Sequence, residues 1–348
     1  MGNDRTSLFE TPVRDMTISW LNPLLETGAS VLSPKGPRGR LSVLIYHRVL
    51  ESPDPLRHGE VDQAMFEWHM ALLSRHFQVL PLSEACRRLV AGTLPARAAA
   101  VTFDDGYADN VTVALPILQR YGVPGTFFIA TAFLDGGRMW NDSVIEWARR
   151  VPAGSVDLTA VSLDSQEVDG HGSRRALAET VIGAIKYLDP DERDQRVAQL
   201  LERMPGRLPD DLMLTTAQVR QLHAAGMEVG GHTHRHPILA SMSAMGARRE
   251  IEEGKQRLEA ITGESVRLFA YPNGKPGRDY RFEHRELVRG LGFEAAVSTH
   301  HGAADRNSDR FQLPRFTPWH DDAARFHMAL LRNLLTRPQP EEAAAPSA

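Results

Sequence analysis

The stretch AVTFDDGYADN, residues 100–110, ends an apolar run abruptly in two adjacent acids, Asp104 and Asp105, followed by a glycine. A short apolar run bounded by a turn signal is typical of a buried strand. Asp-Gly is also common in turns, so one interpretation is that the pair simply ends a strand and begins a helix. The other polar segments of the chain bear on whether the two carboxylates also carry chemistry.

The composition excludes several classes of protein. The 348 residues are 42% hydrophobic and 24% charged, as in globular proteins. A formal net charge of −4 gives no indication of binding to nucleic acid or to an anionic membrane. Cys86 is the single cysteine, so no internal disulfide and no cysteine-based zinc site can form. No segment resembles a secretory signal or reaches the roughly 20 apolar residues of a transmembrane helix. We therefore expect a cytoplasmic protein; its oligomeric state stays open.

Seven short apolar segments alternate with amphipathic helical patterns along most of the chain. Such alternation predicts an α/β fold with a parallel sheet covered by helices, and the number of strands favours closure into a distorted (β/α)7-8 barrel. The expected strands span residues 42–47, 98–103, 125–130, 227–232, 267–272, 294–299 and 311–316.

The chain divides into three expected parts. Residues 1–40 are an N-terminal extension that ends in a linker rich in Pro and Gly, and residues 41–335 form the barrel domain. Residues from about 141 to 212 are mostly helical and polar, which indicates a helical insertion on one face of the barrel. Residues 336–348 have the composition of a disordered tail.

Polar side chains follow almost every expected strand. In a parallel α/β fold the carboxyl ends of the strands meet on one side, where functional groups collect. Packing alone does not explain why so many of these ends are titratable or aromatic. These segments are residues 46–48, 104–106, 232–236, 271–274 and 300–302.

The histidine-rich segment HTHRH, residues 232–236, is the sharpest of these motifs. His232 and His236 are four residues apart and lie on one face of a helix or tight turn, where they can bind one metal ion. By itself the segment favours the alternative, a histidine-rich polar loop with no role as a ligand. Together with the acidic pair it offers two imidazoles and a carboxylate, a common set of ligands in hydrolytic metal sites. One aspartate would then hold the metal, while the other acts as a base toward water.

These residues, taken in order, resemble the motifs of the NodB-homology polysaccharide deacetylases, carbohydrate esterase family four. The segment 102–107 is similar to the first motif of that family, and His232-Thr233-x-x-His236 is similar to the second. Arg267-x-Phe269-x-Tyr271-Pro272 resembles the third. The resemblance covers residues 41–320, and the segments LIYHRV (44–49) and LPRF (313–316) look like the branch of the family associated with exopolysaccharides.

The resemblance implies a role for each matching residue. Asp105, His232 and His236 are expected to hold a divalent metal, first of all Zn²⁺, with Co²⁺, Ni²⁺ or Mn²⁺ as alternatives. The expected general base is Asp104, oriented by a salt bridge from Arg267. The resemblance also implies that the backbone N–H of Tyr107 is an oxyanion donor, that Thr233 braces the histidine loop, and that Tyr271 and Pro272 lie near the substrate. Trp140 and His47 are expected near the substrate for another reason, because each lies at or beyond the end of an expected strand and Trp offers a flat face to a sugar ring.

One motif of the family has no recognisable counterpart. Members carry a Leu-x-His segment near the end of the domain, and its histidine supplies the general acid. The candidates for that role here are His300, His301, His320 and His47.

The function implied is metal-dependent hydrolysis of an amide. The expected substrate is an N-acetylated sugar in an oligosaccharide, a polysaccharide or its precursor, and the products are acetate and a free amine. Two alternatives stay open. One is hydrolysis of a non-sugar amide or a cyclic imide on the same scaffold, and the other is a catalytically idle carbohydrate-binding protein that lacks the acid.

Overall fold

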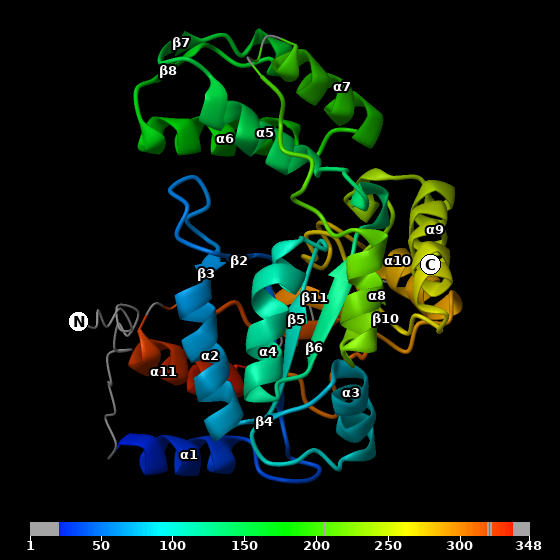
Figure 1. Cartoon of the computed structure of the whole chain (residues 1–348). Coiled ribbons are helices and arrows are strands. Elements are labelled where there is room, and N and C mark those ends of the chain that lie inside the picture. Colours follow the sequence, from blue (N-terminus) through cyan, green and yellow to red (C-terminus); the bar gives the residue numbers. More distant parts are fainter. Residues whose placement is uncertain (1–20, 203, 205, 319, 321, 337–348) are drawn as a thin grey trace, which may run out of the picture.

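The computed structural model describes residues 21–202, 204, 206–318, 320 and 322–336. The first half of the expected extension and nearly all of the expected tail lie outside these residues. Seven parallel strands form the centre of the molecule, in the order β1-β5-β6-β9-β10-β11-β12 (Figure 1). Their bounds are β1 (Leu41–Tyr46), β5 (Ala98–Phe103), β6 (Gly125–Ile129), β9 (Glu228–Gly231), β10 (Leu268–Ala270), β11 (Ala295–His301) and β12 (Leu313–Arg315).

The two ends of this sheet meet and nearly close it into a barrel. The Ile45 N–H of β1 donates to the Phe316 carbonyl at 3.1 Å, and the Phe316 N–H donates to the Val43 carbonyl at 2.7 Å. The predicted (β/α) barrel is therefore confirmed, with seven strands. The sequence reading missed β4 (Gln78–Val79), a short strand that pairs with the first half of β5.

Helices cover the outside of the barrel and its lower end. Figure 1 places α2 and α4 on one flank and α8, α9 and α10 on another, while α3 lies at the amino ends of the strands. The bounds are α2 (Gln63–His76), α3 (Leu82–Ala91), α4 (Leu115–Tyr121), α8 (Thr216–Ala224), α9 (Ala244–Thr262), α10 (Phe282–Gly290) and α11 (Ala323–Leu335), with α1 (Leu21–Leu32) packed on α11. None of the helices in the described part of the chain combines the length and the apolar character needed to cross a membrane.

Side chains alternate across each strand between the barrel interior and the helices, as strand geometry requires. In β5, Ala98 and Ala100 share an inner apolar cluster with Val43 of β1, whereas Val101 and Phe103 belong to the outer cluster. The small inner residues of β5 leave room for larger ones from other strands, such as Phe128 of β6 and Leu268 of β10. Both strands are buried along their whole length, which explains why they lack a polar face in the sequence.

A separate lobe lies over the carboxyl ends of the strands (Figure 1). It contains α5 (Trp140–Arg150), the antiparallel pair β7 (Gly154–Val156) and β8 (Gln166–Val168), α6 (His171–Ile185) and α7 (Pro190–Leu201). These elements pack around a hydrophobic cluster of their own, which includes Trp147, Leu177, Val181 and Val197. A small parallel pair, β2 (Val49–Leu50) and β3 (Val61–Asp62), frames a loop of residues 51–60 between barrel and lobe.

Gly230 in β9 faces the barrel interior, where it makes room for a phenylalanine. A Cβ atom at this position would lie 2.5 Å from Cδ1 of Phe128, a ring that is fully buried. We expect Gly230→Ala to lower the free energy of unfolding by about 1–3 kcal/mol, because the ring has no free space to enter. Denaturant or thermal unfolding of the whole chain measures this.

Gly183→Ala is the matched control for this substitution. Gly183 lies in α6 with nothing within 4 Å of an added Cβ atom, so the same change should raise stability by about 0.5–1 kcal/mol. Equal effects of the two substitutions would contradict the packing argument.

Candidate active site

The two adjacent aspartates at the end of β5 face different partners. Asp104 continues the inward alternation of Ala98 and Ala100, so its carboxylate enters the mouth of the barrel. Asp105 has a φ of +77°, which is uncommon for a residue with a side chain, and Gly106 follows at +88°. This turn directs the Asp105 carboxylate toward β9. A local backbone strain thus separates two neighbouring charges.

His232 and His236 follow β9 and meet Asp105 from the other side. The Nε2 atom of each histidine lies 3.3 Å from Oδ1 of Asp105. Thr233 and His236 also have positive φ values, +66° and +54°. The Thr233 hydroxyl donates to the His232 carbonyl at 2.5 Å and accepts from the His236 N–H at 3.1 Å, so it fixes the tight turn that brings both rings together.

Helix α9 supports this turn from behind. The Glu250 carboxylate accepts hydrogen bonds from the backbone N–H groups of His234 and Arg235, at 3.1 and 2.7 Å. Gly254 allows the helix to approach closely, since a Cβ atom there would lie 2.6 Å from the Thr233 carbonyl oxygen. The strained conformation is therefore held by several contacts at once, as is typical of functional sites.

Three atoms that can bind a cation converge at this point. Nδ1 of His232 lies 2.7 Å from the Ala270 carbonyl, which can only accept, so Nδ1 donates a proton there and Nε2 is the nitrogen that faces Asp105. Burial lowers the pKa of His236 to about 3, which keeps that ring neutral. Oδ1 of Asp105 is buried and has no hydrogen-bond partner among the described residues.

This arrangement fits a divalent cation. The carboxylate oxygen and the two imidazole nitrogens lie within 4.8 Å of one another, and lone pairs in such proximity repel unless a cation lies between them. Burial lowers the pKa of His232, but the charges of Asp104 and Asp105 outweigh that effect and raise it, so the position attracts positive charge. In addition, metal-binding histidines usually donate their other ring N–H to a backbone carbonyl or a carboxylate, as His232 does here. The ligand set leaves coordination positions open for water and substrate.

Asp104 is paired with Arg315, the last residue of β12. Nη1 and Nη2 of Arg315 donate to the two oxygens of the Asp104 carboxylate, each at 2.7 Å. Arg315 also donates from Nε to the Ser298 carbonyl at 2.8 Å, and its side chain is completely buried. Burial raises the pKa of Asp104, but the Arg315 charge outweighs this and holds the pKa below its usual value. Asp104 is therefore ionised at neutral pH and has a fixed orientation.

The expectation that Arg267 orients Asp104 is wrong. Arg267 precedes β10, at the end of the barrel opposite the site, and its side chain is 59% exposed beside Glu294 at 3.3 Å. Arg267 is two residues before Phe269, whose side chain points outward to the helices, so the side chain of Arg267 lies on the outer side as well. Arg315 orients Asp104 instead, because it lies at the carboxyl end of β12, on the same side of the barrel as Asp104. It is two residues after Leu313, whose side chain points inward, so its own side chain points inward too. Arg315 is part of the LPRF segment. Its position at the end of an expected strand was the feature of the sequence from which its role could have been predicted.

Tyr107 lies next to the ligands and is buried. Residues on both sides of it form an antiparallel bridge: the Leu214 N–H donates to the Gly106 carbonyl, and the Ala108 N–H donates to the Leu212 carbonyl, each at 2.9 Å. Backbone groups alternate in direction along an extended chain, so the Tyr107 N–H faces away from this bridge. That leaves it available on the side of the cleft.

A cleft of about 650 Å³ lies above these residues, between the barrel and the lobe. Its floor includes Asp104, Asp105, His232 and His236, and α5 and α6 contribute to its walls. The lobe thus turns an open barrel mouth into an enclosed groove. The other lining residues include His47, Arg48, Arg57, Tyr107, Asn141, Ile145, Arg175, Glu179, Lys186, Asn273 and Lys275.

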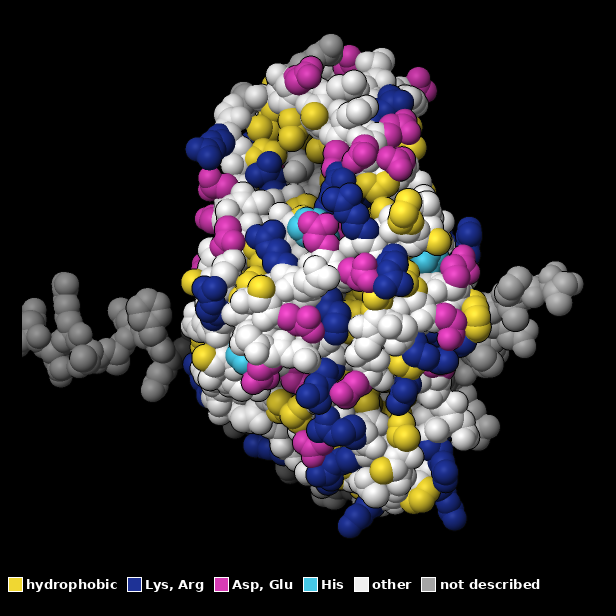
Figure 2. All heavy atoms as spheres, turned by 90° about the vertical axis from the view of Figure 1, so that its right-hand side faces the viewer, with side chains coloured by type: hydrophobic (Ala, Val, Ile, Leu, Met, Phe, Trp, Pro, Cys, Tyr) yellow, Lys and Arg dark blue, Asp and Glu magenta, His cyan; other side chains and the backbone are white. Residues whose placement is uncertain are grey.

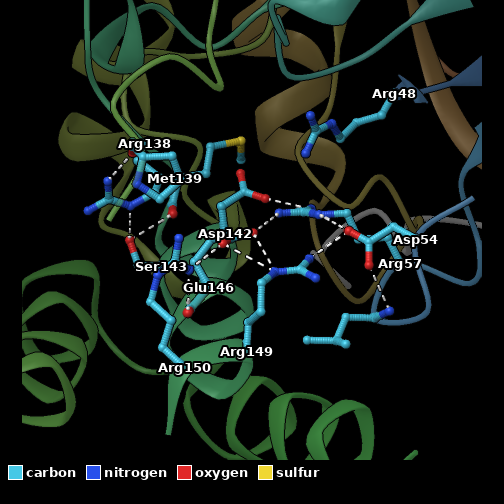
Figure 3. A network of polar contacts seen from close by, with 12 residues as sticks. Arg48, Asp54, Arg57, Arg138, Met139, Asp142, Ser143, Glu146, Arg149 and Arg150 are labelled. Carbon is cyan, nitrogen blue, oxygen red and sulfur yellow. Dashed lines mark hydrogen bonds and ion pairs between the residues drawn. The ribbon is translucent and has the colours of Figure 1, made fainter. Parts of the chain in front are cut away.

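A network of charged side chains fixes one wall of this cleft (Figure 3). Arg57, from the loop between β2 and β3, is buried; it donates to Asp142 of α5 at 2.8 Å and lies 3.5 Å from Glu146. Arg149 of α5 donates a hydrogen bond at 2.6 Å to Asp54, which lies in the same loop as Arg57. Sequence reasoning missed this network, because its members are distant in the chain. It joins the loop to the lobe.

The remaining expected residues do not all reach the cleft. Of the four candidates for the general acid, His47 lines it, whereas the other three do not. The His301 ring lies 5.9 Å from the Phe316 ring, and His320 faces His69 through its backbone carbonyl. His300 is the second-last residue of β11; it is half-buried and does not line the cleft.

Tyr271, Pro272 and Trp140 are also placed elsewhere, which corrects their expected contact with substrate. Tyr271 is fully buried; it stacks on Tyr280 with 3.7 Å between ring centroids and donates to the Phe311 carbonyl. Pro272 is buried beside it. Trp140 packs on the core of the lobe, with the Arg193 guanidinium 4.8 Å above its ring. Tyr271 has the outward alternation of Phe269, Trp140 lies against the core of the lobe, and none of the three lines the cleft.

Comparison with known proteins agrees with this geometry. A family model described as polysaccharide deacetylase matches residues 91–296. The protein YxkH of Bacillus subtilis (strain 168) is 22% identical over 278 residues, which are 79% of this chain and 70% of that protein.

Two solved structures have a similar fold. PplD, a Streptococcus pyogenes deacetylase in complex with acetate, has a TM-score of 0.57 at 19% identity, over 85% of this chain and 98% of that chain. IcaB from Ammonifex degensii has a TM-score of 0.53 at 18% identity, over 87% of this chain and 99% of that chain. The family match spans more than half of the chain and contains both aspartates and both histidines of the site. The chain therefore belongs to the polysaccharide deacetylase family of hydrolases.

Proposed function

We propose that this protein is a metal-dependent N-deacetylase, which removes acetyl groups from an N-acetylated sugar in an oligosaccharide, a polysaccharide or its precursor. The observation that carries the proposal is the convergence of Asp105, His232 and His236 within 4.8 Å, beside an ionised Asp104 fixed by Arg315. Zn²⁺ suits this ligand set, and Co²⁺, Ni²⁺ and Mn²⁺ are the alternatives. The segments around His47 and Arg315 favour an exopolysaccharide as the source of the sugar.

The residues around the site divide the chemistry between them. When bound, a divalent cation polarises the acetyl carbonyl and lowers the pKa of a water molecule. Asp104 accepts the proton of the attacking water, and Arg315 keeps its carboxylate ionised and oriented for that step. The backbone N–H of Tyr107 donates to the carbonyl oxygen as negative charge develops there. The C–N bond then breaks, which releases acetate and the sugar amine.

The departing amine needs a proton, and we assign its donation to His47. This residue follows β1 directly, and β1 pairs in register with β5, the strand that ends in the two aspartates. Its carbonyl accepts from Nδ2 of Asn110 at 2.9 Å, which fixes the backbone at this point. His47 lines the same cleft as Asp104 and Asp105. His47 thus replaces the missing Leu-x-His segment.

The two alternative functions are less well supported by the same observations. A cleft of about 650 Å³ with walls from both barrel and lobe suits a saccharide better than a small amide or imide. An idle binding protein has no need of an ionised base beside three converging ligand atoms. Acetate release from N-acetylated oligosaccharides, compared with hydrolysis of small amides and cyclic imides, distinguishes the three.

Metal removal is the first test. Chelation should abolish acetate release from N-acetylated oligosaccharides, and addition of Zn²⁺ should restore it. Asp105→Asn should lose bound metal and activity together, whereas Asp104→Asn should keep the metal and lose about 10²–10⁴ in kcat. Elemental analysis of the purified protein and an acetate assay measure both. Activity that is indifferent to chelation, or equal metal loss in both variants, would contradict the assigned roles.

The Asp104–Arg315 pair is tested by a matched pair of conservative substitutions. Arg315→Lys keeps the charge but loses the two-point contact, and we expect kcat to fall by about 10²-fold because the base is misplaced. Arg315 lowers the pKa of Asp104, so weakening the contact raises that pKa and moves the acid limb of the kcat/KM profile to higher pH. Arg267→Lys should leave both kcat and the profile unchanged. The opposite ranking of the two variants would refute the assignment, provided that thermal unfolding shows both to be folded.

His47 is tested by changing the leaving group. His47→Gln should reduce hydrolysis of an N-acetylated oligosaccharide by about 10²–10⁴, since the amine leaves poorly without a proton. Hydrolysis of 4-nitrophenyl acetate should fall much less, because nitrophenolate leaves without one. His300→Gln and His301→Gln serve as controls and should retain activity on both. An equal loss on the amide and the ester in His47→Gln would show that the residue acts in some other way.

A further inference from the structure

Two lysines line the cleft, one from the lobe and one from the barrel. Lys186 caps the carboxyl end of α6 in the lobe, and Lys275 lies in the loop that follows β10 of the barrel. The chain has only four lysines among 40 basic residues, the other two being Lys35 and Lys255. Half of the lysines thus occur in a single cleft, each on a different body of the protein.

The other cations of the cleft have acidic partners within the protein. Arg48 pairs with Asp109 at 2.7 Å, and Arg57 pairs with Asp142 at 2.8 Å. Arg175, which lies on the same helix as Lys186, has Glu179 at 3.6 Å. By contrast, in the part of the chain that the structure describes, no carboxylate oxygen lies within 4.0 Å of the ammonium group of Lys186 or Lys275. The charges of these lysines remain available in the cleft.

The nearest acid, Asp279, organises the backbone around the lysines. One of its oxygens accepts from the Lys275 backbone N–H at 3.0 Å, and the other accepts from the Tyr187 hydroxyl at 3.3 Å. The Asp279 side chain is buried, at 1% exposure, whereas Tyr187 is 40% exposed. The two hydrogen bonds join the loop after β10 to the end of α6, which fixes the two lysines relative to each other.

The electrostatic setting is unfavourable for two cations without a carboxylate partner, and the contact of Lys186 is with the Tyr187 ring, whose centroid lies 5.8 Å from its ammonium nitrogen. Burial lowers the pKa of Lys186, Asp279 counteracts this, and the charges of Lys275 and Arg278 lower the pKa further. The excess of positive charge around Lys186 is confined to this part of the cleft. On the face shown in Figure 2, by comparison, basic and acidic side chains are interspersed. A half-buried cation next to like charges destabilises the free protein unless an anion relieves it.

We infer that Lys186 and Lys275 bind an anionic oxygen group, a phosphate or a carboxylate, carried by the saccharide near the sugar that is deacetylated. The inference rests on the proposed deacetylase function and adds the substrate class: a negatively charged N-acetylated saccharide. The ammonium group of lysine is a compact point charge with three donors, which suits a phosphate or carboxylate oxygen without demanding one geometry. Binding would also bridge lobe and barrel, because each contributes one lysine.

Three N-acetylglucosamine oligomers of equal length test this inference. One is neutral, one carries a phosphate at its reducing end, and one has a glucuronate beside the acetylated sugar. We expect the wild-type protein at low ionic strength to show a kcat/KM about tenfold or more higher for at least one of the charged oligomers, with the advantage falling as salt is added. A preference for the phosphate alone indicates a carrier-linked precursor, and a preference for the carboxylate alone indicates an acidic polymer. Equal rates on all three oligomers would overturn the inference.

Substitution of the lysines separates a charge effect from a structural one. In Lys186→Gln/Lys275→Gln the ratio of kcat/KM for charged over neutral oligomer should fall to about one, and in Lys186→Arg/Lys275→Arg it should largely recover. Lys35→Gln, which removes an exposed lysine outside the cleft, should keep the wild-type ratio. A glutamine double variant that retains the ratio would overturn the inference.

A binding measurement distinguishes failure of this inference from failure of the proposed function. Calorimetric titration of the full-length protein with the neutral and charged oligomers requires no turnover. If no oligomer releases acetate but the charged ones bind more tightly, and the glutamine variant loses that difference, the lysine site stands while the deacetylase proposal fails. Acetate release with no preference for charge gives the reverse outcome.

Discussion

The buried ion pair between Asp104 and Arg315 is the contact on which the site depends. It joins the second strand of the barrel to the last one across the interior, with both oxygens of the carboxylate and two nitrogens of the guanidinium engaged at 2.7 Å. Leaving either partner alone in this interior would be costly, because a buried charge without a counter-charge is strongly unfavourable. The same pair keeps the proposed base ionised, so the structure of the barrel and the chemistry at its mouth share one interaction.

Backbone strain supplies the second condition. Asp105, Thr233 and His236 all have positive φ, and each helps to turn a side chain toward the same point. Such conformations persist only where surrounding contacts hold them. Here the bridge beside Tyr107, the hydroxyl of Thr233 and the close approach of α9 at Gly254 provide those contacts. The convergence of three lone pairs is thus prepared by the protein before any ligand arrives.

The lobe determines what the site can reach. Its own hydrophobic cluster makes α5, α6 and α7 a packed unit, and the buried charges of Arg57 and Asp142 connect that unit to a loop of the barrel. Together they form the groove above the aspartates, which Lys186 and Lys275 both line. Chemistry at the strand ends and selection of substrate by the groove therefore come from different parts of the chain. The family match, residues 91–296, includes both the aspartates and histidines of the site and the elements of the lobe.

The sequence by itself determined the strands, their parallel arrangement and the short-range motifs. Runs such as residues 98–103 are buried on both faces, so their composition alone identifies them, and Asp104–Asp105 and His232–His236 are each close together in the chain. Tertiary structure decided which distant residues meet them. Arg315 rather than Arg267 reaches Asp104, because that depends on which end of a strand a residue occupies and on the inward or outward alternation of its side chain. Strand direction and alternation likewise place the Tyr271 side chain in the core and His47 in the lining of the cleft. Contacts across the barrel depend on register and strand direction, which local sequence does not encode.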